Sequence, residues 1–262
     1  MTEKESFPRR SKYYCYLPEN PALESILKHF TPLPLLLSCG VFVGALLPTQ
    51  MALAISLLVI LTTLTRATAR EMGVISNPSK QNLIRGRYSA TLPEDEFVVF
   101  LVGTRSNSAF PMNKTDKKMG DAMKAMMQEL EAKPELGCLA VETYGGHSTG
   151  SDTLYVQYWK SVDHLQKFAQ DSQNSHYSPW KWLMRVGRES DEVGFWHETF
   201  KVNKGEYEAI YVNLPRIHLA GARGADVRKV AHSKNSTMSG RLGKGTGVET
   251  KDWPKDMGDS TY

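Results

Sequence analysis

The residues with the clearest chemical potential lie in the stretch "GFWHETF", which covers residues 194–200. His197 stands there beside Trp196, in an apolar run typical of a strand. A neutral imidazole accepts a proton near pH 7 and can ligate haem iron, so His197 is a candidate base or iron ligand. The alternative is a histidine that only makes hydrogen bonds inside the protein. Side chains alternate along a strand, so His197 and Phe195 are predicted to share one face and Trp196 to occupy the other.

Further polar and aromatic side chains are predicted to assist His197. Arg105 ends a predicted strand, and its guanidinium can orient an anionic or carbonyl oxygen through forked hydrogen bonds. Asn213 offers an amide in a later strand, and we predict that it orients oxygen atoms as well. Aromatic side chains in the strands are predicted to contact the substrate, and these are Phe195, Trp196, Tyr158 and Tyr211. A surface ion pair for Arg105, and structural roles for the others, remain the alternatives.

Several common catalytic motifs are absent from the sequence. It contains no HExxH or CxxC pair and no placeable group of two histidines and a carboxylate, so no metal site is predicted. No GxGxxG stretch precedes a helix, and no nucleophile elbow is present. The cysteines, Cys15, Cys39 and Cys138, are scattered, which favours a reducing compartment. The net charge of +4 is too small to indicate a nucleic-acid partner.

The pattern of apolar residues predicts the elements that position these side chains. Apolar residues recur at three- and four-residue steps over residues 119–133, which predicts a helix with one apolar face. A second helix is predicted to begin at Ser161, which is its predicted N-cap. Apolar, β-branched runs predict strands over 96–103, 137–145, 153–160, 192–202 and 207–215. The order βαββαβ, with one extra strand, predicts a ferredoxin-like α+β fold.

The first helix carries methionines on its apolar face. Met123 and Met127 belong to that face. Methionine fills irregular gaps in a core, but it can also line a cavity, so both are candidate substrate contacts. The strands read apolar on both faces, whereas helices cover only one face of such a sheet. A second copy of the chain is therefore predicted to cover the other face, which gives a homodimeric α+β barrel.

A long uncharged run precedes these elements. Residues 31–65 contain no charged side chain, and a membrane span needs only ~20 apolar residues. Pro48 interrupts the run, which favours a hairpin of two helices of ~16 residues over one long tilted span or a buried pair. Arginine and lysine flank both ends, so both ends are predicted to face the cytosol, with the endoplasmic reticulum as the membrane.

The sequence therefore divides into five predicted segments. They are a cytosolic segment over 1–30, a membrane hairpin over 31–65, a linker over 66–92, a ferredoxin-like domain over 93–220 and a basic flexible tail over 221–262. The linker and the tail are predicted from their polar, glycine- and proline-containing composition.

Stretches such as "EFVVFLVGTR", "TLYVQYWKSVDHLQKFA", "VGFWHETF" and "YEAIYVNLPR" resemble the fumagillin-cluster-type monooxygenase family. That family lies within the antibiotic-biosynthesis-monooxygenase-like, dimeric α+β barrel group. The resemblance covers residues 92–218 and implies an oxygenase of secondary metabolism, either cofactor-free or dependent on haem, with molecular oxygen as co-substrate. It also implies a role for His176, because a histidine near this place serves related barrels; a solvent-exposed loop histidine is the alternative.

The expected function is a membrane-anchored monooxygenase that oxidises a lipophilic polyketide or terpenoid intermediate. Two other functions remain open. One is a haem-dependent lyase or dehydratase of the same fold, with His197 or His176 as the axial ligand. The other is a non-catalytic, membrane-tethered barrel that binds a lipophilic intermediate or scaffolds another oxygenase.

Overall fold

The computed structural model describes residues 33–77, 80–108, 114–145, 152–230 and 238–242. The chain forms two compact units. Among the described residues, one unit extends from residue 33 to residue 81 and the other from residue 82 to residue 242. The predicted N-terminal segment over residues 1–30 lies outside the described residues.

The smaller unit contains a pair of helices that turn at Pro48. Helix α2 (Leu33–Leu46) is followed by α3 (Thr49–Glu71), and Pro48 occupies the N-cap of α3. The 23 residues of α3 span about 35 Å at ~1.5 Å per residue, so α3 is long and apolar enough to cross a membrane. With 14 residues, α2 is much shorter, so the two helices are not of the equal length predicted.

The larger unit is built on a four-stranded antiparallel sheet with the strand order β3-β4-β2-β5. Its strands are β2 (Glu96–Ser106), β3 (Cys138–Gly145), β4 (Asp152–Trp159) and β5 (Val193–Asn203). Helix α4 (Lys114–Ala132) connects β2 to β3, while α5 (Val162–Gln170) and α6 (Tyr177–Glu189) connect β4 to β5. This connectivity confirms the predicted ferredoxin-like fold. Helix α6 was not among the predicted elements.

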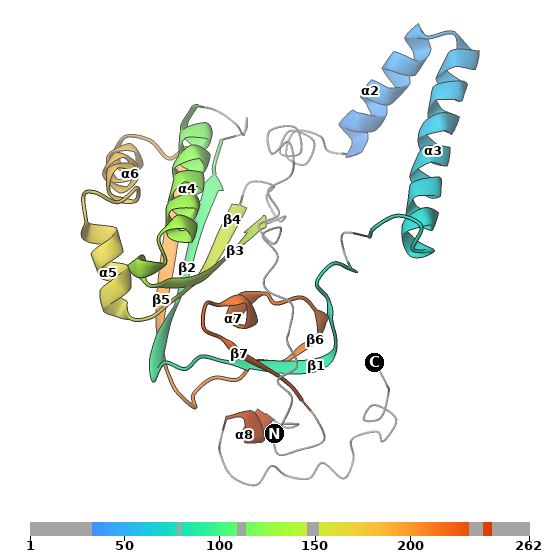
Figure 1. Ribbon diagram of the computed structural model, residues 1–262. Coiled ribbons are helices and arrows are strands. Elements are labelled where there is room, and N and C mark those ends of the chain that lie inside the picture. Colours follow the sequence, from blue (N-terminus) through green and yellow to red (C-terminus); the bar gives the residue numbers. More distant parts are fainter. Residues whose placement is uncertain (1–32, 78–79, 109–113, 146–151, 231–237, 243–262) are drawn as a thin grey trace. The chain divides into compact units, whose positions relative to one another are not determined.

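Three helices cover one face of this sheet (Figure 1). Val98 and Val102 of β2 point to that face and are buried against α4, whose methionines recur at helical spacing. Trp159 of β4 is fully buried there, and its indole Nε1 donates to Gln157 Oε1 at 2.9 Å. Ser161 accepts a hydrogen bond from the backbone N–H of His164, which confirms the predicted N-cap of α5.

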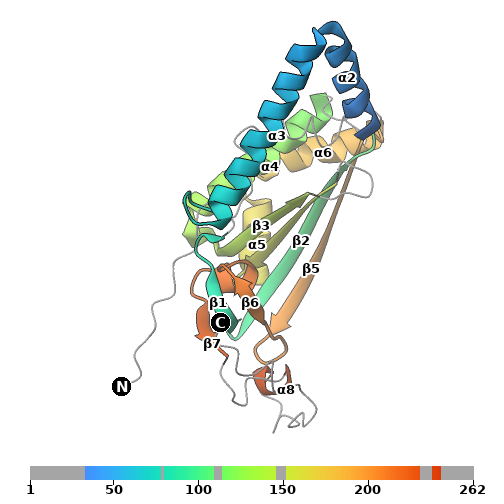
Figure 2. The same cartoon turned by 90° about the vertical axis from the view of Figure 1, so that its right-hand side faces the viewer.

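A second, three-stranded sheet covers part of the opposite face. It consists of β6 (Tyr211–Leu214), β1 (Ile84–Thr91) and β7 (Asp226–Lys229) in the order β6-β1-β7, with the short helix α7 (His218–Gly221) beside it. Figure 2 shows this sheet at the end of the larger sheet where β2 begins. Leu219 and Ala222 pack there against Phe97 and Ala140. The chain itself therefore covers part of the face that was predicted to need a second copy.

This second sheet corrects two predicted boundaries. Residues 66–92 are not a linker, because α3 continues to Glu71 and residues 84–91 form β1. Gly86 has φ +85° and the register shifts beside it, which interrupts the alternation that would reveal a strand. The predicted tail over residues 221–262 contains the strand β7. This strand has one apolar side chain, Val227, which is too few to form a recognisable pattern. Residues 231–237 and 243–262 lie outside the described part.

Arg223 ties this C-terminal segment to the helical layer. Its guanidinium donates to the carbonyl oxygens of Leu130 and Glu131 at the end of α4 and of Cys138 in β3. A cation is favourable at a helix C-terminus, where the last carbonyl groups lack partners within the helix. Residues beyond the predicted domain boundary at 220 thus complete the domain.

The uncovered part of the second face carries Trp196 directly over Gly103. These residues are opposite one another in β5 and β2. A Cβ atom at position 103 would lie 2.2 Å from the indole Nε1, so only glycine allows the ring to lie on the strand in this way.

We expect Gly103→Ala to destabilise the protein by about 1 kcal/mol or more when Trp196 is present, because the indole must leave its place. In a Trp196→Ala background the same change should be neutral or stabilise by up to ~1 kcal/mol, since alanine restricts the unfolded backbone more than glycine does. Urea unfolding in detergent, followed by circular dichroism, measures both effects. Equal effects in the two backgrounds would contradict the proposed contact.

Candidate functional site

The helix-covered face of the sheet carries His197. It pairs with Val102 of β2, and its ring centroid lies 5.4 Å from that of Phe100 and 5.7 Å from that of Phe195. Trp196 points to the other face, as the alternation predicted. β5 is an edge strand, and the His197 side chain is exposed. His197 therefore lies on an accessible part of the helix side and is not a core histidine.

His176 lies on the same side, at the residue that precedes α6. It is half-buried, and its ring lies 5.9 Å from that of Phe168. His176 Nδ1 is 3.2 Å from the carbonyl oxygen of Ala169. A carbonyl oxygen only accepts, so we assign the proton to Nδ1. The neutral ring then presents its lone pair at Nε2, as a base or a metal ligand requires.

The surroundings of His176 favour this neutral form. Burial lowers the pKa of His176 from its ordinary value of 6.5, the hydrogen bond to Ala169 works against that change, and positive charge on His197 lowers the pKa further. Both imidazoles lie on the helix-covered side of the sheet, although the sequence pointed to them separately.

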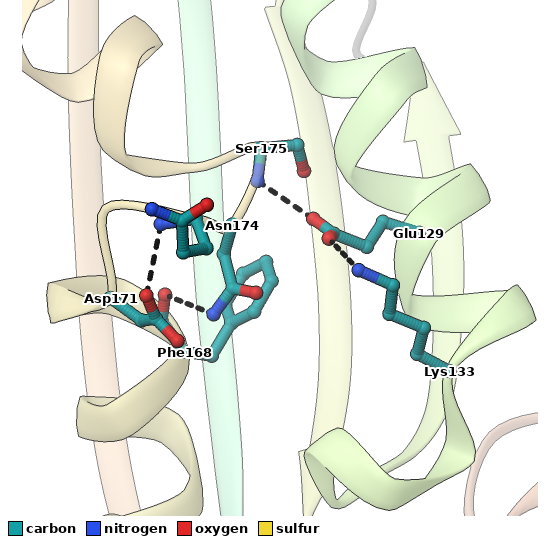
Figure 3. A network of polar contacts seen from close by, with 7 residues as sticks. Glu129, Lys133, Phe168, Asp171, Asn174 and Ser175 are labelled. Carbon is teal, nitrogen blue, oxygen red and sulfur yellow. Dashed lines mark hydrogen bonds and ion pairs between the residues drawn. The ribbon is translucent and has the colours of Figure 1, made fainter.

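A polar network fixes the loop that leads into His176 (Figure 3). The Glu129 carboxylate of α4 accepts from the backbone N–H of Ser175 at 2.7 Å and from Lys133 Nζ at 2.7 Å. Burial alone would raise the pKa of Glu129, but the hydrogen bonds from Lys133 and Ser175 outweigh it and leave the pKa lowered. Asn174 Nδ2 donates to the carbonyl oxygen of Phe168 at 3.2 Å. These contacts hold the α5–α6 loop against α4 and so position His176.

The predicted methionine contacts also lie on the helix side, but in the core. Met123 is 4% exposed, and Met127 is partly buried against the same cluster. Both therefore pack the layer between α4 and the sheet.

Arg105 and Asn213 do not lie beside His197. Arg105 pairs with Gly194, two residues before Trp196, so it shares the face of Trp196 and lies on the other side of the sheet from His197. Asn213 belongs to β6, has φ +51°, and its Oδ1 accepts from the backbone N–H of Gly86 at 2.8 Å. That contact stabilises the irregular pairing of β1 with β6. The predicted cooperation of Arg105 and Asn213 with His197 is not what the geometry favours.

Tyr158 and Tyr211 lie on the second face, where they line a cavity of about 440 Å³. The cavity lies between the four-stranded sheet and the segment 207–219, and His218 also lines it. His218 was not among the predicted site residues, because a histidine that opens a four-residue helix follows no recognisable motif.

His218 is held firmly in the cavity wall. Its backbone N–H donates to Glu142 Oε1 at 3.1 Å, and its Nε2 hydrogen-bonds with the Tyr144 hydroxyl. Glu142 is only 2% exposed. His218 has φ +51°, a conformation uncommon for any residue but glycine, and these contacts compensate for its strain.

In the described part of the chain no three histidine, cysteine, aspartate or glutamate side chains are grouped closely enough to hold a metal ion.

Part of the chain is similar to a known protein family. Residues 97–219 match the family described as monooxygenase af470-like. The chain is 28% identical over 247 residues to monooxygenase af470 of Aspergillus fumigatus, which covers 84% of this chain and 86% of that protein.

Two solved structures are also similar to the chain. An aldoxime dehydratase in complex with butyraldoxime matches with a TM-score of 0.44 and 13% identity, over 57% of this chain and 42% of that one. SnoaB, a cofactor-independent oxygenase from Streptomyces nogalater, matches with a TM-score of 0.30 and 10% identity, over 40% of this chain and 91% of that one.

The lowered pKa of His176 predicts a pH-dependent stability. Between that pKa and the ordinary value of 6.5 the unfolded chain binds more protons than the folded chain. The contribution of neutral His176 to the free energy of unfolding is therefore fully present above pH 6.5, and it is lost as the pH falls through this window. We expect His176→Asn to flatten the difference between stabilities at pH 7.5 and pH 5, whereas His197→Asn should reduce it only partly. Thermal unfolding at a series of pH values tests this, and an unchanged slope in His176→Asn would refute it.

Proposed function

We propose that this chain belongs to the af470-like monooxygenase family, whose model matches residues 97–219, and that it oxidises a lipophilic small molecule at a membrane surface. The observation that carries this proposal is the state of His176. It is a half-buried, neutral imidazole with its proton on Nδ1 and its lone pair on Nε2, and His197 lies on the same side of the sheet.

His176 is the proposed general base of a cofactor-free oxygenation. A base near neutrality removes a proton from a carbon that a neighbouring carbonyl group acidifies, and the carbanion then transfers an electron to molecular oxygen. For a CH₂ group the overall change is R₂CH₂ + O₂ → R₂CO + H₂O. The substrate carbon loses four electrons, which equal the four that O₂ gains in forming the carbonyl oxygen and water, so no external reductant is needed. His197 receives or relays the proton, because it is exposed at the edge of the same face.

The helical pair supports a lipophilic substrate and a membrane location. All described α3 side chains are unburied within the chain, and the helix is apolar over its first four turns. An apolar substrate partitions into the bilayer, so an enzyme anchored there meets it at high local concentration. We place the two helices in the endoplasmic reticulum membrane, with the larger unit in the cytosol, because positive charge flanks the run at both ends.

A homodimer follows from the part of the sheet that remains uncovered. Trp196 and Phe200 project from β5 on the second face and are 44% and 49% exposed. Aromatic side chains of this size are typical of interface cores. A second copy at this patch would complete a sheet-to-sheet barrel beyond the area that β1, β6 and β7 cover.

The same imidazole lone pair suits a haem-dependent reaction, which is the competing proposal. The visible spectrum of the full-length protein, expressed with a haem precursor and purified in detergent, distinguishes the two. A Soret band that shifts in His176→Asn or His197→Asn identifies the ligand and rules out the cofactor-free proposal. A featureless spectrum favours the base.

His176→Asn should lower turnover by about 10²- to 10⁴-fold, the usual contribution of a general base. The measurement is metabolite profiling of the producing organism with the variant in place of the native chain. We expect a precursor to accumulate that carries two more hydrogen atoms and one fewer oxygen atom than the normal product. Tyr177→Phe, one residue away, is the matched control and should leave the profile unchanged. Full product from a well-expressed His176→Asn chain would exclude this role and favour the binding-protein alternative.

The membrane anchor predicts resistance to extraction. The full-length chain should sediment with membranes after carbonate treatment. Leu58→Asp with Leu61→Asp should release it, since each central aspartate costs ~2.5–3.5 kcal/mol in a bilayer. Arg70→Asp, in the last turn of α3, is the control and should stay membrane-bound. Release of the unchanged chain would refute the anchor.

A further inference from the structure

The cavity on the second face has the volume of a small-molecule site and is partly open to solvent. Its volume of about 440 Å³ lies within the ~300–1,000 Å³ typical of ligand pockets. The wall contributed by the sheet consists of Phe97, Val99, Tyr158 and Val202, and the segment from Tyr207 to Leu219 forms the other wall. We call it the Tyr158 cavity. It lies on the opposite side of the sheet from His176 and His197.

The apolar walls are rigidly held. The Phe97 and Tyr207 rings meet edge to face with centroids 4.8 Å apart, and the Tyr207 hydroxyl accepts from the backbone N–H of Leu92 at 2.8 Å. Leu219 is 5% exposed and packs in the same cluster as Phe97. The cavity is therefore bounded by side chains that are already engaged with one another, so a ligand does not have to order them.

The Tyr158 hydroxyl is the polar group available to a ligand. Within the part of the chain that the structure describes it makes no hydrogen bond. Burial raises the pKa of Tyr158, and Tyr211 and Glu142 raise it further, so the phenol keeps its proton. It is thus a hydrogen-bond donor that lacks an acceptor, in an apolar wall. The Tyr158 side chain is half-buried, so its hydroxyl can donate to an oxygen atom of a ligand that enters the cavity.

The neighbouring polar groups already have hydrogen-bond or ion-pair partners within the protein. The Tyr211 hydroxyl accepts from the backbone N–H of Ala220 at 3.3 Å, and Glu208 pairs with Arg241 at 2.6 Å. His218 Nε2 is bonded to Tyr144. The cavity therefore suits a ligand with an apolar body and a hydrogen-bond-accepting oxygen near Tyr158. An anionic ligand would find no cation to compensate its charge among the lining residues described above.

We propose that the Tyr158 cavity is a second binding site, which takes an apolar small molecule with one hydrogen-bond-accepting oxygen, such as a ketone. The Tyr158 hydroxyl donates to that oxygen, and Phe97, Val99, Val202 and Leu219 surround the apolar body. The site is separated from the histidine site by the thickness of the sheet and does not depend on the oxygenation chemistry proposed there.

Photochemical labelling with benzophenone tests this site directly. Benzophenone is an apolar ketone, and its excited carbonyl takes a hydrogen atom from a nearby C–H group. The ketyl and carbon radicals then combine, so the label stays as a tertiary alcohol on that carbon. The full-length chain in detergent is irradiated at subsaturating benzophenone, and labelled peptides are mapped by mass spectrometry. Peptides of α2 and α3 serve as an internal reference for labelling from the detergent.

In the native chain we expect residues 202–219 to be labelled more strongly than the reference peptides of α2 and α3. Tyr158→Phe should lower this labelling about three- to tenfold, the effect of losing one hydrogen bond. Ala209→Phe, which fills the cavity, should abolish it. The matched controls are Tyr177→Phe on α6 and Thr199→Phe on the exposed helix-side face of β5, and both should label as the native chain does. Melting temperatures establish that each variant is folded.

Labelling of residues 202–219 that is equal in Tyr158→Phe, Ala209→Phe and the native chain would overturn the proposal. Labelling confined to peptides around His176 and His197 would also overturn it, and would at the same time support a ligand at the histidine site. Labelling of the Tyr158 cavity together with full turnover in His176→Asn would support this inference and refute the proposed function.

Discussion

The whole architecture depends on a sheet that is apolar on both faces. Val98 and Val102 of the central strand β2 are buried on one side, and Phe97 is buried on the other. A sheet of this kind has to be covered twice, because each exposed apolar face would leave a large hydrophobic area in water. Helices α4, α5 and α6 cover one face, and β1, β6, β7 and α7 cover part of the other. Each covering layer also creates its own candidate site, with imidazoles on the helix side and phenols on the other.

The period of the apolar residues was sufficient to predict the elements of the main sheet. Its four strands, α4, α5 and the Ser161 cap all follow from local patterns of one segment each. The second sheet could not be predicted in this way. β1 contains a glycine with positive φ and a register shift, and β7 has four residues with one apolar side chain. Such strands are defined by their partners, which lie far away in the sequence, and not by their own composition.

The candidate site was predictable in its residue types but not in its grouping. His197 and Trp196 were assigned to opposite faces because alternation along a strand is a local property. The separation of Arg105 and Asn213 from His197 is a tertiary property, and it depends on the register of β2 with β5 and on the second sheet. The hydrogen bond that fixes the tautomer of His176 arises from the geometry of the α5–α6 loop, for which the sequence carries no motif. His218 was missed for the same reason.

The pairing of β1 has a consequence for how the protein is made. Tyr88 pairs with Tyr211 and Ala90 pairs with Val227, so both partners of β1 leave the ribosome more than a hundred residues after it. During that interval β1 is already synthesised, directly after the apolar α3, while its edges have nothing to bind. Contacts of such long sequence separation form slowly. During synthesis of this chain, β1 therefore stays unpaired until β6 and β7 have been made, and in that period the nascent chain depends most on chaperones to avoid association with other chains.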